Sequence, residues 1–268
     1  MDTDYILSND LPYLMYRLRE AGLTVELDFD QTRHRMLLLL NGSVKWSVHD
    51  LTLRLSVADP AAHRAMMEPW IPHLVELTRL GQTVLRNPEE LRRRVHTEFV
   101  VDDLATNPRY SYCRQYPGEL KLILSLTDGD TRFELSDEQL DQCPLNIDEL
   151  FYYGQMNTDN VAVNRVEQMG PLTSLTTRSV YISAKAANVP ALMSRFQIHA
   201  PHGLFLMAPM CHVLCYSPVD PANILQQLMA VIHTIRYPMA AASRTPGMLL
   251  SRNIFYYSPE GTYETITQ

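Results

Sequence analysis

Residues 24–48, TVELDFDQTRHRMLLLLNGSVKWSV, decide the fold of the N-terminal part of the chain. VELDFD alternates apolar and acidic residues, which is the pattern of a strand with one buried face. MLLLL ends at Asn41 and Gly42, the dipeptide that most favours a tight hairpin turn. With VKWSV as the return strand, this segment predicts a three-stranded antiparallel meander.

Helices and further hairpins are expected on both sides of the meander. Leu11, Leu14 and Leu18 recur at helical spacing ahead of it, after the N-cap candidates at residues 8–10. The pairs GELKLILSL/TRFEL, GLFLMAP/HVLCYSP and NIFYYS/TYETIT predict three later hairpins, and RYSYCRQY and SVYISA read as further strands. Asn146 with Glu149 forms a capping-box signature before a helix.

This order of elements predicts an α+β fold. Strands that pair as hairpins are neighbours in sequence, and helices interrupt them irregularly, which favours antiparallel or mixed sheets with helices packed on them. We expect two sub-domains. Residues 1–96 would hold the first helix, the meander and further helices, and residues 97–268 would form a C-terminal α+β domain with hairpins.

The overall charge makes two classes of partner improbable. The 268 residues carry 23 Lys and Arg against 30 Asp and Glu, a formal net charge of −7. Nucleic-acid binding and attachment to an anionic membrane both depend on basic residues, so we expect neither. The ten glycines lie too far apart to form a phosphate-binding loop.

The cysteines and the N-terminal sequence indicate a cytoplasmic protein. Four cysteines are too few for a disulfide scaffold in a chain of this length. The first residues, MDTDYILSND, lack the charged and apolar regions of a secretory signal. We therefore expect a cytoplasmic protein with reduced thiols, without a cofactor or bound metal.

Residues 199–215, HAPHGLFLMAPMCHVLC, hold the densest group of possible metal ligands or catalytic side chains. His199, His202, Cys211 and Cys215 could hold zinc or provide a thiol nucleophile with an imidazole base. We favour core cysteines and loop histidines, because free cysteine is among the most buried residue types. If Cys211 and His212 lie on a strand, they point to opposite faces and do not pair.

Tyrosine is abundant, with 14 residues against two tryptophans. Tyr110, Tyr112 and Tyr116 would form one stripe if RYSYCRQY were a strand. Such a stripe is either the solvent-facing edge of the hydrophobic core, with the hydroxyls reaching water, or a surface that contacts another protein. We assign these three tyrosines as candidate binding residues.

Four segments resemble the YtpQ-like family of uncharacterised bacterial proteins: YSYCRQYPGELKLIL, NIDELFYYGQMN, SRFQIHAPHGLFLMAPMCHVLCYSP and NIFYYSPEGTYETI. The resemblance covers about residues 98–266 and consists of patterns of apolar residues. It implies a bacterial α+β protein and transfers no catalytic residue.

Together these features favour a non-catalytic protein-binding or adaptor module, of the immunity or chaperone kind. We expect a protein partner and consider a homodimer. The alternative is a cysteine- or zinc-dependent hydrolase that uses His199, His202, Cys211 and Cys215.

Overall fold

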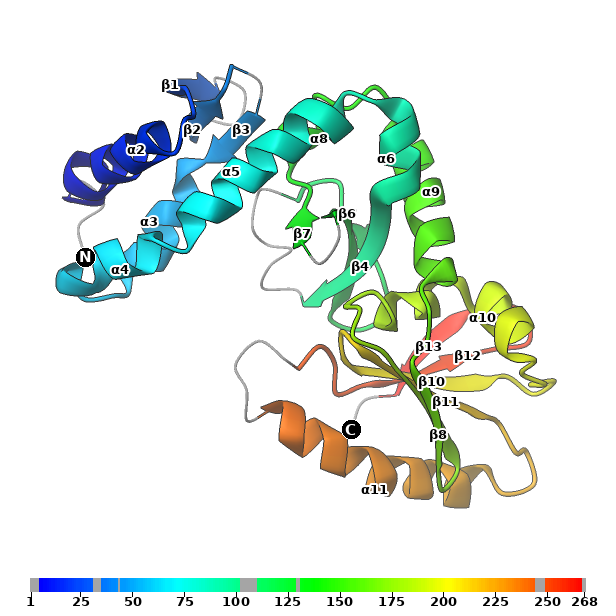
Figure 1. Ribbon diagram of the computed structural model, residues 1–268. Helices are drawn as coiled ribbons and strands as arrows, with labels where there is room; N and C mark the ends of the chain where they lie inside the picture. Colours follow the sequence, from blue (N-terminus) through cyan, green and yellow to red (C-terminus); the bar gives the residue numbers. More distant parts are fainter. Residues whose placement is uncertain are drawn as a thin grey trace. The chain divides into compact units, whose positions relative to one another are not determined.

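A computed structural model describes residues 5–30, 35–42, 44–101, 110–128, 131–243 and 249–266. They form helices packed with antiparallel sheets, which confirms the predicted α+β class (Figure 1). Two compact units are present: Met1–Leu91 with Glu138–Pro144, called unit 1, and Arg92–Asp137 with Leu145–Gln268, called unit 2. The predicted boundary between residues 96 and 97 remains a prediction.

Unit 1 contains the expected meander of β1 (Val25–Asp30), β2 (Arg35–Leu40) and β3 (Val44–Ser47), paired in that order. Asn41 and Gly42 lie in the turn between β2 and β3, and both have positive φ angles, of 48° and 61°. The other elements of the unit are η1 (Ile6–Asp10), α2 (Leu11–Glu20), α3 (Val48–Ser56), η2 (Pro60–Ala62), α4 (His63–Met67), α5 (Trp70–Leu80) and η3 (Gly81–Leu85). Along the chain, α6 (Pro88–Arg94) and α8 (Asp137–Leu140) cross from one unit to the other.

Two details of unit 1 differ from the sequence-based expectation. No side chain caps α2, because the preceding π-helical turn η1 continues directly into it and Asp10 already has helical angles. The return strand stops at Ser47, and Val48 begins α3 instead of extending the strand. The two helices that follow η2 are separate, since α4 ends at Met67 and α5 begins at Trp70.

In unit 2, a small sheet is built around β6 (Leu120–Asp128). It pairs with β4 (Val95–Val101) on one side and with β5 (Arg114–Gln115) and β7 (Thr131–Glu134) on the other. The β6–β7 hairpin is as expected, although Gly129 and Asp130 of its turn lie outside the described residues. Helix α9 (Ile147–Asn160) starts at the predicted capping box and covers the outer edge of β4.

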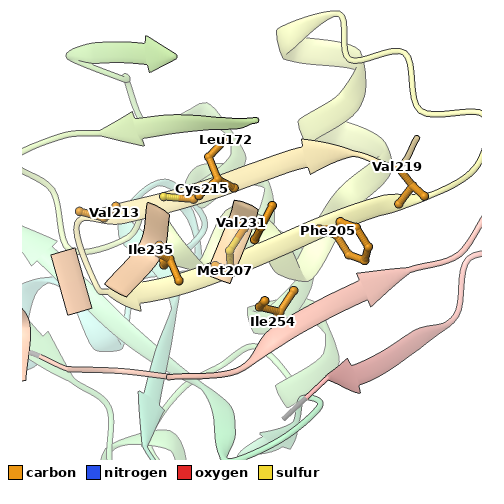
Figure 2. Packing of buried hydrophobic residues seen from close by; sticks show 9 residues of the cluster. All are labelled: Leu172, Phe205, Met207, Val213, Cys215, Val219, Val231, Ile235 and Ile254. Atoms are coloured by element: carbon orange, nitrogen blue, oxygen red, sulfur yellow. The ribbon is translucent and has the colours of Figure 1, made fainter. Parts of the chain in front are cut away.

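The larger sheet of unit 2 has the order β13-β12-β10-β11-β9-β8. Its strands are β8 (Arg165–Met169), β9 (Leu172–Thr176), β10 (Leu204–Met210), β11 (Val213–Pro218), β12 (Ile254–Tyr257) and β13 (Tyr263–Ile266). Both hairpins expected here, β10–β11 and β12–β13, are confirmed. Helix α11 (Ile224–Ser243) packs Val231 and Ile235 onto the core of the sheet, beside Met207 and Cys215 (Figure 2).

Two predicted strands of unit 2 are wrong. In RYSYCRQY only Arg114 and Gln115 are strand, because residues 110–113 form a turn. SVYISA instead leads through a turn into the 3-10 helix η4 (Ser183–Asn188), which continues into α10 (Val189–Phe196). Tertiary contacts of Tyr110 and Tyr181, described below, explain both differences.

Candidate functional site

The structure places the three candidate tyrosines at separate internal contacts. Tyr110 is buried and donates from its hydroxyl to Glu134 Oε2 at 2.6 Å. Tyr112 donates to the Leu135 carbonyl at 2.5 Å, and Tyr116 donates to the Ala186 carbonyl at 3.0 Å. Burial raises the pKa of Tyr112 and Tyr116 well above the ordinary value. A partner-binding role for these tyrosines stays a prediction, and the structure uses their hydroxyls within the fold.

The histidines and cysteines of residues 199–215 do not converge. His199 and His202 are exposed ahead of β10, whereas Cys211 lies in the turn at the far end of that strand. Seven strand residues separate the two ends by roughly 23 Å. Cys215 lies within β11 and faces the apolar core. Among the described residues, no three His, Cys, Asp or Glu side chains are arranged to hold a metal ion.

Cys211 and His212 correct one expectation. They form the two-residue turn between β10 and β11 and are not strand residues, so their side chains approach each other. The Cys211 Sγ atom lies 3.7 Å from His212 Nδ1. Burial, followed by the nearby Glu98, raises the pKa of Cys211, and burial raises the pKa of Cys215 to about 11. Both thiols are therefore protonated at neutral pH, the weakly nucleophilic form.

The different burial of the two cysteines gives a testable difference in stability. Cys215→Ser places a hydroxyl in the apolar core, so we expect the free energy of unfolding to fall by about 1–3 kcal/mol. Cys211→Ser changes a half-buried turn residue and should cost less than about 1 kcal/mol. Urea unfolding of the two variants measures the difference, and equal losses would contradict this placement.

A buried group of charged and polar side chains lies on the face of the small sheet opposite α9. The strand register puts Glu98 of β4, Ser125 of β6, and Arg132 and Glu134 of β7 on one face. On the opposite face, Thr97 contacts α9. We call Glu98, Ser125, Arg132, Glu134, Tyr110 and Tyr181 the Glu98 cluster.

Arg132 joins the two carboxylates of the Glu98 cluster. Its Nη1 donates to Glu98 Oε1, and its Nη2 donates to Glu134 Oε1 at 2.8 Å. The Glu98 side chain is 3% exposed, whereas that of Arg132 is 35% exposed. Glu134 also accepts the hydroxyl of Tyr110, so the charges are linked to the tyrosine by hydrogen bonds.

The second oxygen of Glu98, Oε2, is buried and has no hydrogen-bond partner in the described part of the chain. Burial raises the pKa of Glu98 to about 7, against the lowering effect of Arg132. Nearby, Ser125 Oγ donates to the buried Tyr181 hydroxyl at 3.1 Å, and the Tyr181 ring stacks on His96 with centroids 4.4 Å apart. The Glu98 carboxyl is therefore a group that can gain or lose a proton near neutral pH.

The Glu98 cluster was not predicted, although two signals for it are present in the sequence. Glu98 is the one carboxylate in the strand VHTEFVV and is followed by three apolar residues. Arg132 and Glu134 are two residues apart, on one face of a strand. Neither signal shows that the two segments meet. That information comes only from the pairing of β4 and β7 with β6.

Two other buried polar contacts stabilise helix positions. Lys185 donates from Nζ to the carbonyls of Thr158 and Asp159, at 2.7 and 2.6 Å, at the C-terminal end of α9. Burial lowers the pKa of this lysine to about 8. In unit 1, His63 Nδ1 lies 2.6 Å from Asp10 Oδ2, and both side chains are buried.

The edges of the unit 2 sheets differ in how well they are covered. At the β4 edge, Thr158 Oγ1 of α9 accepts from the Thr97 amide and donates to its carbonyl, both at 3.0 Å. The larger sheet ends at β8, whose only strand neighbour among the described residues is β9. Arg165, Val166 and Gln168 of this strand are exposed, with Val166 56% exposed and the Arg165 side chain 69% exposed. An open edge strand of this kind is a template for pairing with another chain.

Comparison of the chain with protein-family models, with curated proteins and with solved structures finds no match. In the part of the chain that the structure describes, no helix is both long and apolar enough to cross a membrane.

Proposed function

We propose that this protein is a non-catalytic protein-binding module, of the adaptor, immunity or chaperone kind, that binds an extended segment of a partner along β8. The observation that carries the proposal is the open edge of β8, in contrast to the covered edge of β4. A bacterial cytoplasmic location and the resemblance to the YtpQ-like family remain parts of this proposal.

Strand addition provides both affinity and selectivity at such an edge. Alternate residues of an antiparallel strand direct their N–H and C=O groups away from the strand already paired. An added strand satisfies these groups, and the side chains of β8 select among sequences. Val166 offers an apolar contact. On the other face of the strand, Arg165 and Glu167 form an ion pair with each other and offer one charge of each sign.

A neutral strand-forming peptide tests the proposal. We expect a short peptide of alternating Thr and Val, with Lys at its ends, to slow hydrogen exchange of the Val166 and Gln168 amides. Val166→Pro removes an outward N–H that the β9 pairing does not use, so it should weaken binding at least about tenfold. The fold should persist, because proline is tolerated on edge strands.

Val166→Thr is the matched control, because it keeps the N–H and a β-branched side chain. It should bind the peptide like the wild type. Peptide binding that leaves the β8 amides unprotected, or that survives Val166→Pro, would exclude strand addition at this edge.

The second candidate is a thiol-dependent hydrolase. The observation in its favour is now the 3.7 Å approach of Cys211 to His212, in place of a site with His199 and His202. The raised pKa of Cys211 opposes it, since the thiolate is the nucleophilic form.

A further inference from the structure

The backbone of β8 fixes which of its residues face outward. β8 and β9 are joined by the two-residue loop Gly170–Pro171, where Gly170 has a φ of +58°. In such a hairpin the flanking pair, Met169 with Leu172, exchanges hydrogen bonds, and every second residue pair after it does the same. Glu167 therefore directs its backbone groups to β9, and Val166 and Gln168 direct theirs to the free edge.

The charges on β8 select one self-complementary register for pairing with a second copy. When Val166 lies opposite Val166 of an antiparallel second copy, Arg165 of each copy lies opposite Glu167 of the other. A shift of the centre by one residue in either direction sets Arg165 opposite Arg165, or Glu167 opposite Glu167. Like charges directly opposite are destabilising, and opposite charges stabilise the pair.

We propose that β8 pairs with β8 of a second copy of this chain, antiparallel and centred on Val166. This inference rests on the proposed strand addition at this edge and names its partner. The outward groups of Val166 then exchange two hydrogen bonds across the twofold axis. The two Arg165–Glu167 pairs occupy the closer, non-hydrogen-bonded positions, where cross-strand side chains approach best.

The edge strand β1 of unit 1 shows the opposite arrangement. Glu26 and Asp28 give it charges of a single sign, which would repel an identical strand in each antiparallel register that overlaps them. Same-sign charge is one of the devices by which proteins protect a sheet edge. The mixed signs on β8 provide no such protection against a second copy.

Charge reversal tests the pairing through the oligomeric state. We expect the wild type to show a concentration-dependent dimer in sedimentation velocity and light scattering. Arg165→Glu and Glu167→Arg should each weaken self-association at least about tenfold, because each variant sets like charges opposite. An equimolar mixture of the two variants should dimerise again, since acidic positions then face basic ones.

Glu264→Arg on β13, the opposite edge of the same sheet, is the matched control and should dimerise like the wild type. A wild type that stays monomeric, single variants that dimerise normally, or a mixture that stays monomeric would overturn the inference. If the wild type is monomeric but the Thr/Val peptide still protects Val166 and Gln168, only the second-copy inference fails. If the peptide also fails to bind, the proposed function fails with it.

Discussion

Arg132→Met is expected to lower the free energy of unfolding by about 3 kcal/mol at pH 8. The substitution keeps most of the side-chain volume and removes the cation that contacts both Glu98 and Glu134. Glu98 is 3% exposed, so its carboxylate would remain in the interior without a compensating charge. Removal of one partner from a buried ion pair costs far more than the net value of the pair. Urea unfolding followed by circular dichroism measures the change.

Two comparisons separate this effect from lost packing. Arg178→Met removes an exposed arginine of the same unit and should change the free energy of unfolding by less than about 0.5 kcal/mol. In a Glu98→Gln background, Arg132→Met should cost at least about 1 kcal/mol less, because no buried carboxylate is left unpaired. Equal costs in both backgrounds would show that Arg132 acts through packing alone.

Local signals were sufficient to predict much of the fold. The hairpins β6–β7, β10–β11 and β12–β13 were visible because each joins two alternating segments through a short turn. The capping box at Asn146 placed the start of α9 for a similar reason, since all its atoms come from four consecutive residues. In each case the pattern and the contacts that enforce it lie close together in the chain.

Where long-range contacts decide the structure, the sequence-based expectation was wrong. The alternating tyrosines of residues 110–116 imitate a strand, but their hydroxyls bind Glu134 and the carbonyls of Leu135 and Ala186. These contacts span from 23 to 70 residues, and no local pattern reports them. The same limit hid the Glu98–Arg132 pair, which spans 34 residues.

The expectation for Cys211 and His212 failed for a different reason. On a strand their side chains would point to opposite faces, and that expectation depended on where the turn fell. The structure puts the turn at Cys211 and His212, so Cys211 leaves the strand while Cys215 stays in the core. A shift of one or two residues in the position of a turn along the chain is enough to change which side chains meet.

As the pH rises from about 4.5 to 7, the free energy of unfolding of the wild type is expected to fall by up to about 3 kcal/mol because of Glu98 alone. In the folded protein, burial raises the pKa of Glu98 to about 7, from an ordinary value of 4.5. Below pH 4.5 the carboxyl is protonated in both states. Between the two values the unfolded chain releases a proton that the folded chain retains, so folding becomes less favourable as the pH rises. Above about pH 7 both states are ionised and this contribution becomes constant.

Glu98→Gln isolates this contribution, because the amide is nearly the same size and does not titrate in this range. The variant should lose the part of the pH dependence that lies between pH 4.5 and 7, and its stability relative to the wild type should improve as the pH rises. Glu260→Gln, at an exposed carboxylate of the same unit, is the control and should retain the wild-type profile. Free energies of unfolding from urea titrations across this pH range give the comparison. Parallel profiles for the wild type and Glu98→Gln would contradict this prediction. They would mean that Glu98 ionises at its ordinary pKa and that its burial makes no pH-dependent contribution to the stability of the protein.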